Sequence, residues 1–340
     1  MELYATGFNA WNQLRFEDGG NGLHLHQEPD DIRVFTRVLS DDAIDHVDPF
    51  ISYTLVRSRP AGGLSFRLRS AGMVPKEHDA LRAAADDDDD IYKSQSAKLG
   101  HVNFAEASNG FVIVYGRLDT FHQYQSMRDL LSHKYNNNLK ETPGTDTTTT
   151  QHTFSGFPNV VQLVAYETGF AALSSTGQVW TWGDERYAAC LGRDVDDDTS
   201  PPNKPGLVTD LEDLPTGPIT KIAAGGYTLA ALTAGNDLYC WGDRGRSAVI
   251  LDDMGDRPTP IVIDDNDIAD IGVGDQHLIA LTVDGELFTI GNNSNGQLGL
   301  QASSAASWTR VDLGLDTARQ SIVGVAAGSR NSFVIVRNQG

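Results

Sequence analysis

Short runs of alternating apolar and polar residues recur along the chain, and each pair of runs is separated by a tight turn. Residues 222–242 and 271–291 align without a gap as two strands that end in glycine. The intervening turn Asp284-Gly285 has the composition of a two-residue β-hairpin connection. Because β-branched and aromatic residues alternate with a period of two, the pattern predicts strands rather than helices.

The pattern recurs along most of the chain. A third copy covers residues 164–183, and weaker copies extend the series toward both ends. One column of the alignment holds Thr54, Asn109, Gly169, Thr228, His277 and Asn331. A period of roughly fifty residues with about four short strands per unit is typical of a β-propeller. Six column positions predict six blades, with seven as the alternative.

The two ends of the chain each carry part of one repeat. The last repeat stops near Val336, after the first strand of its hairpin, and residues 3–14 align without a gap with residues 287–298. We therefore expect the N-terminal strands to complete the C-terminal blade. Such closure pairs sheet edges that would otherwise invite aggregation.

Glycine-rich motifs give the repeats a recognisable form. The segments Val-Trp-Thr-Trp-Gly183, Leu-Tyr-Cys-Trp-Gly242 and Gly291-Asn-Asn-Ser-Asn-Gly-Gln-Leu-Gly299 resemble the repeats of the RCC1-like (regulator of chromosome condensation 1) propeller family. Within that family the layout is most similar to the RCC1 domain-containing proteins, with the alpha-tubulin suppressor / Kti13 type as runner-up. The resemblance implies an all-β, closed RCC1-like β-propeller that spans residues 1–340 as a single domain. It is specific for the fold and weak for function.

Composition adds limits. Lys and Arg number 26 against 46 Asp and Glu, and the net charge of −20 argues against direct nucleic-acid binding. Two segments interrupt the repeats, at about 73–98 with the run Asp86–Asp90 and at about 132–153 with Asn136–Asn138. Their polar composition predicts mobile surface insertions.

Cysteine usage and hydropathy suggest a compartment. Cys190 and Cys240 cannot form a disulfide framework, and the start of the chain lacks the pattern of a signal peptide. The longest strongly apolar run, residues 111–115, is far shorter than a membrane helix requires. We expect a nuclear and/or cytoplasmic protein that does not enter a membrane.

Nothing in the sequence forms a catalytic motif, so we expect a protein that is not an enzyme and needs no cofactor. Trp182 and Trp241 are interpreted as packing residues, and His277 occupies the column in which the family has a structural histidine. Two histidines, His24 and His26, are too few for a zinc site. The series that begins at Asp194 lacks the glycine and glutamate of a calcium loop. No metal site is predicted.

Two charged surfaces are candidates for partner binding. A predicted hairpin carries four arginines that we expect to face one side: Arg57, Arg59, Arg67 and Arg69. An acidic surface includes Asp264, Asp265 and Asp267, together with Asp86–Asp90 and the Asp194 series. Solvation is the simpler explanation of the acids, whereas arginine is enriched at binding hot spots.

The function predicted from these features is a non-catalytic protein–protein interaction scaffold that acts as a monomer. By the family resemblance, its partner would be a chromatin-associated regulator. One alternative is a guanine nucleotide exchange factor for a small GTPase, the activity of the family's founding member. Another, implied by the Kti13 resemblance, is a partner of a small metalloprotein in tRNA and diphthamide modification.

Overall fold

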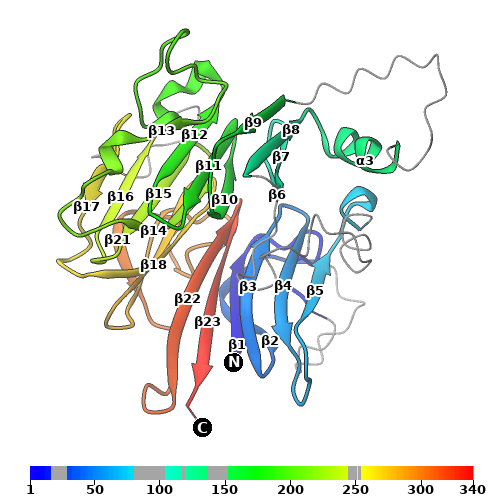
Figure 1. Ribbon diagram of the computed structural model, residues 1–340. Coiled ribbons are helices and arrows are strands. Elements are labelled where there is room, and N and C mark those ends of the chain that lie inside the picture. The colour runs from blue at the N-terminus through cyan, green and yellow to red at the C-terminus, as the bar shows by residue number, and fades with distance from the viewer. Residues whose placement is uncertain are drawn as a thin grey trace.

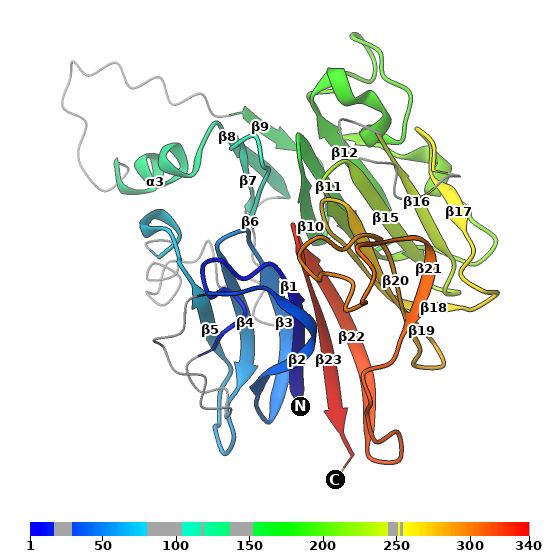
Figure 2. The same ribbon diagram turned by 180° about the vertical axis from the view of Figure 1, so that it is seen from behind.

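The computed structural model describes residues 1–16, 29–79, 104–116, 119–136, 152–243, 251 and 254–339. Within these ranges the chain forms six antiparallel sheets that are arranged as blades around a channel (Figures 1 and 2). The predicted all-β propeller with six blades is confirmed, and the described residues contain no seventh sheet. No helix within them is long and apolar enough to cross a membrane.

We number the blades along the chain and give the strands of each from the channel outward. Blade 1 contains β3 (Ala43–Pro49), β4 (Tyr53–Arg59) and β5 (Arg67–Gly72). Blade 2 contains β6 (Phe104–Glu106), β7 (Val112–Gly116), β8 (Thr120–Tyr124) and β9 (His152–Ser155). Blade 3 contains β10 (Val160–Tyr166), β11 (Gly169–Ser174), β12 (Val179–Gly183) and β13 (Gly206–Leu207).

The remaining blades follow the same plan. Blade 4 contains β14 (Ile219–Gly225), β15 (Thr228–Thr233), β16 (Leu238–Gly242) and β17 (Thr259–Ile261). Blade 5 contains β18 (Ile268–Val273), β19 (His277–Thr282), β20 (Leu287–Asn292) and β21 (Ser304–Val311). Blade 6 contains β22 (Gln320–Gly328), β23 (Asn331–Asn338), β1 (Glu2–Gly7) and β2 (Ile32–Ser40). Helices outside the sheets include α3 (Met127–Asn136), η1 (Glu185–Leu191) and η2 (Thr209–Leu211), and residues 76–79 are also helical.

Blade 6 joins the two ends of the chain, as the sequence predicts. Strand β1 pairs antiparallel with β23, in a register that runs from Glu2 opposite Val336 to Gly7 opposite Asn331. The two termini lie close together in both views (Figures 1 and 2). Gly7 has a φ of +112°, the same value as Gly291, its counterpart in the alignment with blade 5. Only glycine adopts this backbone readily.

The loops that follow these two glycines are also equivalent. The Asn9 side-chain oxygen accepts a hydrogen bond from the Leu14 amide at 2.9 Å, and the Asn293 oxygen accepts one from the Leu298 amide at 2.8 Å. Both asparagines are buried. The ungapped alignment of the N-terminus with blade 5 therefore describes a real structural repeat.

The hydrophobic core is divided among the junctions between blades. Five junctions each contain a cluster of buried side chains drawn from both neighbouring blades, those of blades 2–3, 3–4, 4–5, 5–6 and 6–1. Near blade 1, the described cluster of blade 2 contains only its own strands and α3. Ser126 directly precedes helix α3, and its hydroxyl accepts a hydrogen bond from the Asp129 amide in a capping arrangement.

The structure corrects three sequence-based details. In blade 1 the residue equivalent to His277 is Tyr53 and not Thr54. The Phe50 amide donates a hydrogen bond to the Tyr53 carbonyl, just as the Gly274 amide donates to the His277 carbonyl. In blade 2 a three-residue turn moves it from Asn109 to Phe111, whose carbonyl accepts from Ala107. Within the segment 132–153 that is predicted as an insertion, residues 132–136 belong to α3 and residues 152–153 to β9, and residues 137–151 lie outside the described part of the chain.

Candidate binding site at the channel mouth

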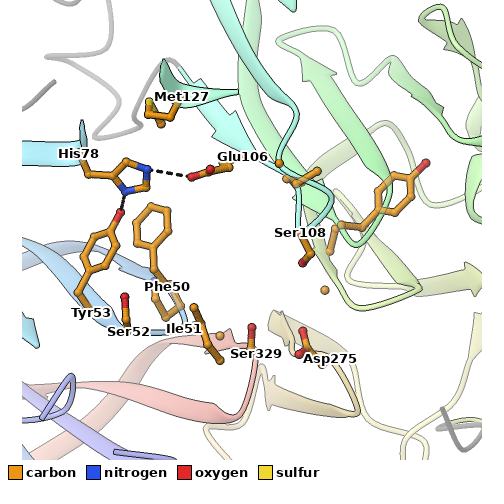
Figure 3. A pocket seen from close by; sticks show the side chains of 18 of the residues that line it. Phe50, Ile51, Ser52, Tyr53, His78, Glu106, Ser108, Met127, Asp275 and Ser329 are labelled. Carbon is orange, nitrogen blue, oxygen red and sulfur yellow. Dashed lines mark hydrogen bonds and ion pairs between the residues drawn. The ribbon is translucent and has the colours of Figure 1, made fainter. Parts of the chain in front are cut away.

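One end of the channel opens into a cavity of about 750 Å³. The inner strands of all six blades end here, so their turns form the rim; we call this end the mouth and the other side of the propeller the opposite face. Residues of blade 1 include Phe50 and Ile51, and the far wall includes Asp275 and Ser329 (Figure 3). Ile51 is partly exposed at this rim.

The wall between blades 1 and 2 is held by a chain of three polar side chains. The His78 ring hydrogen-bonds the Tyr53 hydroxyl through Nδ1 and lies 2.9 Å from a Glu106 carboxylate oxygen through Nε2 (Figure 3). The Phe50 ring stacks on Tyr53 with 4.3 Å between centroids. Tyr53 is 2% exposed and His78 8%. The Tyr53 phenol is therefore a buried structural group and not an accessible nucleophile.

The far wall of the mouth carries Asp275, a carboxyl group with a raised pKa. Burial raises the pKa of Asp275 to about 6, and the neighbouring Glu167 charge adds to this effect, while a hydrogen bond with Ser329 and the Arg330 charge lower it. Figure 3 shows Asp275 across the cavity from His78. Carboxyl groups on two walls give the mouth the chemistry to hold a cationic or hydrogen-bond-donating group of a partner.

Sequence inspection did not identify this site. His78 lies in a segment interpreted as an insertion, and Glu106 lies in an eroded repeat. Asp275 could have been identified from the repeat alignment. The turn that precedes the aligned column residue places Glu167, Asp275 and Ser329 at equivalent positions on the rim. Only the fold brings His78 and Glu106 together, because the link crosses a blade junction.

The four predicted arginines do not face one side, and that prediction is wrong. In the β4–β5 register Arg57 lies opposite Leu68, whereas Arg67 lies opposite Ser58 and Arg69 opposite Val56. Residues directly opposite each other share a sheet face. Arg57 and Arg59 therefore occupy one face of the hairpin, and Arg67 and Arg69 the other.

The hairpin lies on the opposite face of the propeller, and so does the predicted acidic loop. Asp264, Asp265 and Asp267 are exposed in the connection between β17 and β18. Asp264 and Asp265 have φ values of 47° and 57°, which a tight polar turn tolerates. Because the loop and the arginine hairpin belong to different blades, the structure does not unite them in one site.

Several other residues considered from the sequence are buried within the blades. His277 is fully buried, and its Nε2 lies 2.9 Å from the Ser332 hydroxyl; burial lowers its pKa to about 4. The Trp241 ring N–H donates to the Cys190 carbonyl at 3.1 Å, and burial raises the pKa of the Cys190 thiol to about 12. Cys240 is also a buried free thiol. These groups pack the blades and have no access to a ligand.

The metal candidates divide into described and undescribed residues. Asp196 accepts hydrogen bonds from the Asp198 and Thr199 amides, as in a closed polar turn. Among the residues that the structure describes, no group of three or more His, Cys, Asp or Glu could hold a metal ion. His24, His26 and Asp86–Asp90 lie outside the described residues.

Comparisons with known proteins agree with the repeat structure. Two family models, both described as the regulator of chromosome condensation (RCC1) repeat, match residues 219–246 and 268–297 and residues 284–335. These segments contain β14, β15 and β16 of blade 4, all four strands of blade 5, and β22 with part of β23 in blade 6.

Two human relatives each match less than half of this chain. The human regulator of chromosome condensation is 34% identical over 145 residues, which cover 42% of this chain and 33% of that protein. The human probable E3 ubiquitin-protein ligase HERC4 is 32% identical over 151 residues, 42% of this chain and 14% of that protein. This chain thus spans a third or less of the length of these relatives.

Solved structures match nearly the whole fold. Prp20p from Saccharomyces cerevisiae, described with its binding properties to Gsp1p and histones, aligns with a TM-score of 0.59, 14% identity, and 100% and 92% coverage of the two chains. Human WBSCR16 aligns with a TM-score of 0.54, 14% identity and 99% coverage of both. At this identity the likeness concerns the fold alone.

Proposed function

Because this chain is a β-propeller built from RCC1 repeats, we propose that it is a non-catalytic protein-interaction module whose partner docks over the channel mouth. The cavity there is the observation that carries the proposal. Its rim collects turns from every blade, so a partner docked there would reach segments from all six blades of a closed ring.

The chemistry of the rim fits a protein ligand. Ile51 offers exposed apolar surface beside the cavity, and the carboxyl groups of Glu106 and Asp275 lie on separate walls. A partner that places an apolar residue near Ile51 and a basic residue between the acids would satisfy both. We further propose that the chain acts as a monomer in the nucleus or cytoplasm and that its partner is a chromatin-associated regulator, in keeping with the name of its human relative.

Site-specific photocrosslinking tests this proposal. A photoreactive amino acid replaces Ile51 at the mouth in one variant and Val262, exposed on the opposite face, in a matched control. We expect partner adducts from position 51 that disappear when Asp275→Lys is added. Equal adducts from both positions, or adducts from position 262 alone, would contradict docking at the mouth.

Guanine nucleotide exchange on a small GTPase is the second candidate function. It is favoured by the likeness to Prp20p, a protein described with its binding to Gsp1p. Release of a fluorescent guanine nucleotide from a panel of small GTPases separates the two hypotheses. Accelerated release at sub-stoichiometric amounts of this chain would replace the scaffold hypothesis by exchange activity. The third hypothesis, a Kti13-like partner of a small metalloprotein, stays a prediction from resemblance.

A further inference from the structure

The β4–β5 hairpin of blade 1 exposes apolar side chains far from the mouth. Its connection covers residues 60–66, whereas the corresponding connections of blades 3, 4 and 5 have four residues each. The loop projects from the molecule on the side where the termini lie (Figure 1). Leu64 is fully exposed, Phe66 is 39% exposed and Leu68 38%. Three large apolar side chains clustered on one tip are unusual for a solvated surface.

Two arginines lie over the aromatic ring of this group of apolar side chains. The guanidinium carbons of Arg57 and Arg59 lie over the Phe66 ring, 5.1 and 5.9 Å from its centroid. The strand register puts Leu68 on the same face as Arg57. We call the set Arg59, Leu64, Phe66 and Leu68 the hairpin patch. Its ring is oriented by cation–π contacts before any ligand arrives.

Neighbouring acids neutralise some of the hairpin arginines but not all. Arg57 pairs with Asp45 at 2.8 Å, and Arg69 pairs with Asp41 at 3.0 Å. Arg59 makes no ion pair with any residue that the structure describes, and its guanidinium lies over the ring of Phe66. In a chain with a net charge of −20, an arginine without an acidic partner beside exposed apolar side chains marks a place for an external anion.

We propose that the hairpin patch binds an extended segment of a partner protein that carries alternating acidic and apolar residues. A carboxylate of the segment pairs with Arg59 while the following apolar side chain packs on Phe66 and Leu68. This surface is separate from the mouth, because the hairpin tip lies on the opposite face. Blade 1 thus contributes to two binding surfaces, one at each end of its strands.

The chemistry of the patch favours this occupant over nucleic acid. A nucleic acid meets the same repulsion from a chain of net charge −20 at every phosphate, and it brings no aliphatic side chain to pack on Phe66 and Leu68. A short acidic segment needs only one charge-assisted contact and gains the burial of three apolar side chains. Part of the affinity remains at high salt because the apolar contacts are not screened.

The test uses a fluorescent twelve-residue peptide of alternating aspartate and leucine with one central phenylalanine, and the full chain. Fluorescence anisotropy measures its Kd for the unaltered chain, Arg59→Glu and Phe66→Ser. Arg319→Glu and Val262→Ser are matched controls, because both are highly exposed on the same face in other blades. We expect each patch variant to raise the Kd about tenfold or more, and each control to leave it within about twofold.

Four outcomes would overturn the proposal: equal binding of a lysine-for-aspartate peptide, equal loss in the controls, tighter binding of a single-stranded oligonucleotide, or peptide binding only after Asp86–Asp90 are replaced by serine. The last would identify the chain's own acidic run as the occupant. Asp275→Lys at the mouth leaves peptide binding unchanged if the two surfaces are independent. Failure of the mouth proposal and failure of this one are therefore distinguishable.

Discussion

Blades 3 to 6 and blades 1 and 2 solve the same packing problem in different ways. Between blades 3 and 4 the Glu167 amide donates a hydrogen bond to the Gly226 carbonyl at 2.7 Å. Between blades 5 and 6 the Asp275 amide donates one to the Ser329 carbonyl at 3.1 Å. Each of these junctions also has a shared hydrophobic cluster. We call blades 3 to 6 the regular arc and blades 1 and 2 the eroded arc.

The junction between blades 1 and 2 depends on side chains instead. His78 joins blade 1 to Glu106 of blade 2, and its ring lies 6.2 Å from that of Phe104. No two-blade hydrophobic cluster occurs there among the described residues. The comparison teaches that a propeller ring tolerates one junction of different construction when the others are uniform. That junction is also where the mouth has its distinctive polar wall.

Removing residues 1–14 gives the largest expected effect. The deletion takes away β1, so β23 and β2 lose their shared neighbour and the buried Leu3 and Leu14 leave the core. The loss exceeds the whole stability of a typical domain, about 5–15 kcal/mol. We expect the protein to unfold or to oligomerise through its open edges, as seen by circular dichroism and size-exclusion chromatography.

A monomeric product of this deletion with an unchanged Tm would contradict ring closure. An alanine substitution of exposed Trp11 inside the same segment is a suitable control, because it leaves every strand pairing in place. The control should melt within a few degrees of the unaltered protein.

Two glycine substitutions compare a crowded strand end in the regular arc with an open turn in the eroded arc. Gly291 and Gly110 have φ values of 112° and 90°, so alanine is strained at both. An added Cβ at Gly291 would lie 2.3 Å from the Gln276 carbonyl oxygen, whereas at Gly110 the nearest atom is 4.0 Å away. We expect Gly291→Ala to cost about 3 kcal/mol or more and Gly110→Ala about 1–2, from urea unfolding. Equal losses would mean that the close approach of the Gln276 carbonyl does not add to the backbone strain at Gly291.

The eroded junction is tested by His78→Ala and Glu106→Gln. Removing either partner of this partly buried pair is expected to cost about 1–3 kcal/mol and to raise amide hydrogen exchange in β3 and β6. The control is Gln162→Ala, which removes side-chain hydrogen bonds to Ile222 across blades 3 and 4. Because that junction keeps its hydrophobic cluster, exchange in β10 and β14 should rise less. A larger rise in the control would reverse the comparison.

The two arcs also differ in how far sequence could predict them. In the regular arc, the ungapped repeat places His277 at the first residue of β19, and the same alignment gives the hydrogen bonds of Asn9 from those of Asn293. In the eroded arc, a three-residue turn moves the equivalent of His277 from Asn109 to Phe111. The alternation of arginines likewise did not reveal that Arg67 lies on the other face of the sheet from Arg57. Local pattern predicts strands, but register and cross-blade contacts depend on turn length.

The smallest effect is expected from pH at the mouth. The pKa of Asp275, raised to about 6, exceeds the ordinary value of 3.8, so between pH 4 and 6 the folded state holds this proton more tightly than the unfolded state. Folding stability is therefore lost as the pH rises through this window. Asp275→Asn, which has no such proton, should gain about 1–2 kcal/mol relative to the unaltered protein between pH 4 and pH 7.

Only the difference between these two proteins is informative, because His277 acts in the opposite direction. Its pKa, lowered by burial to about 4, makes the unfolded state bind the extra proton below pH 6.5, so its contribution destabilises the fold as the pH falls. His277 is present in both proteins and cancels in the comparison of urea unfolding curves. If Asp275→Asn shows the same pH dependence as the unaltered protein, Asp275 is hydrated like a surface carboxylate. The turn that contains Asp275 would then be exposed to solvent like the rest of the rim. In the regular arc, burial would be limited to the strands and would not include the turns at the mouth.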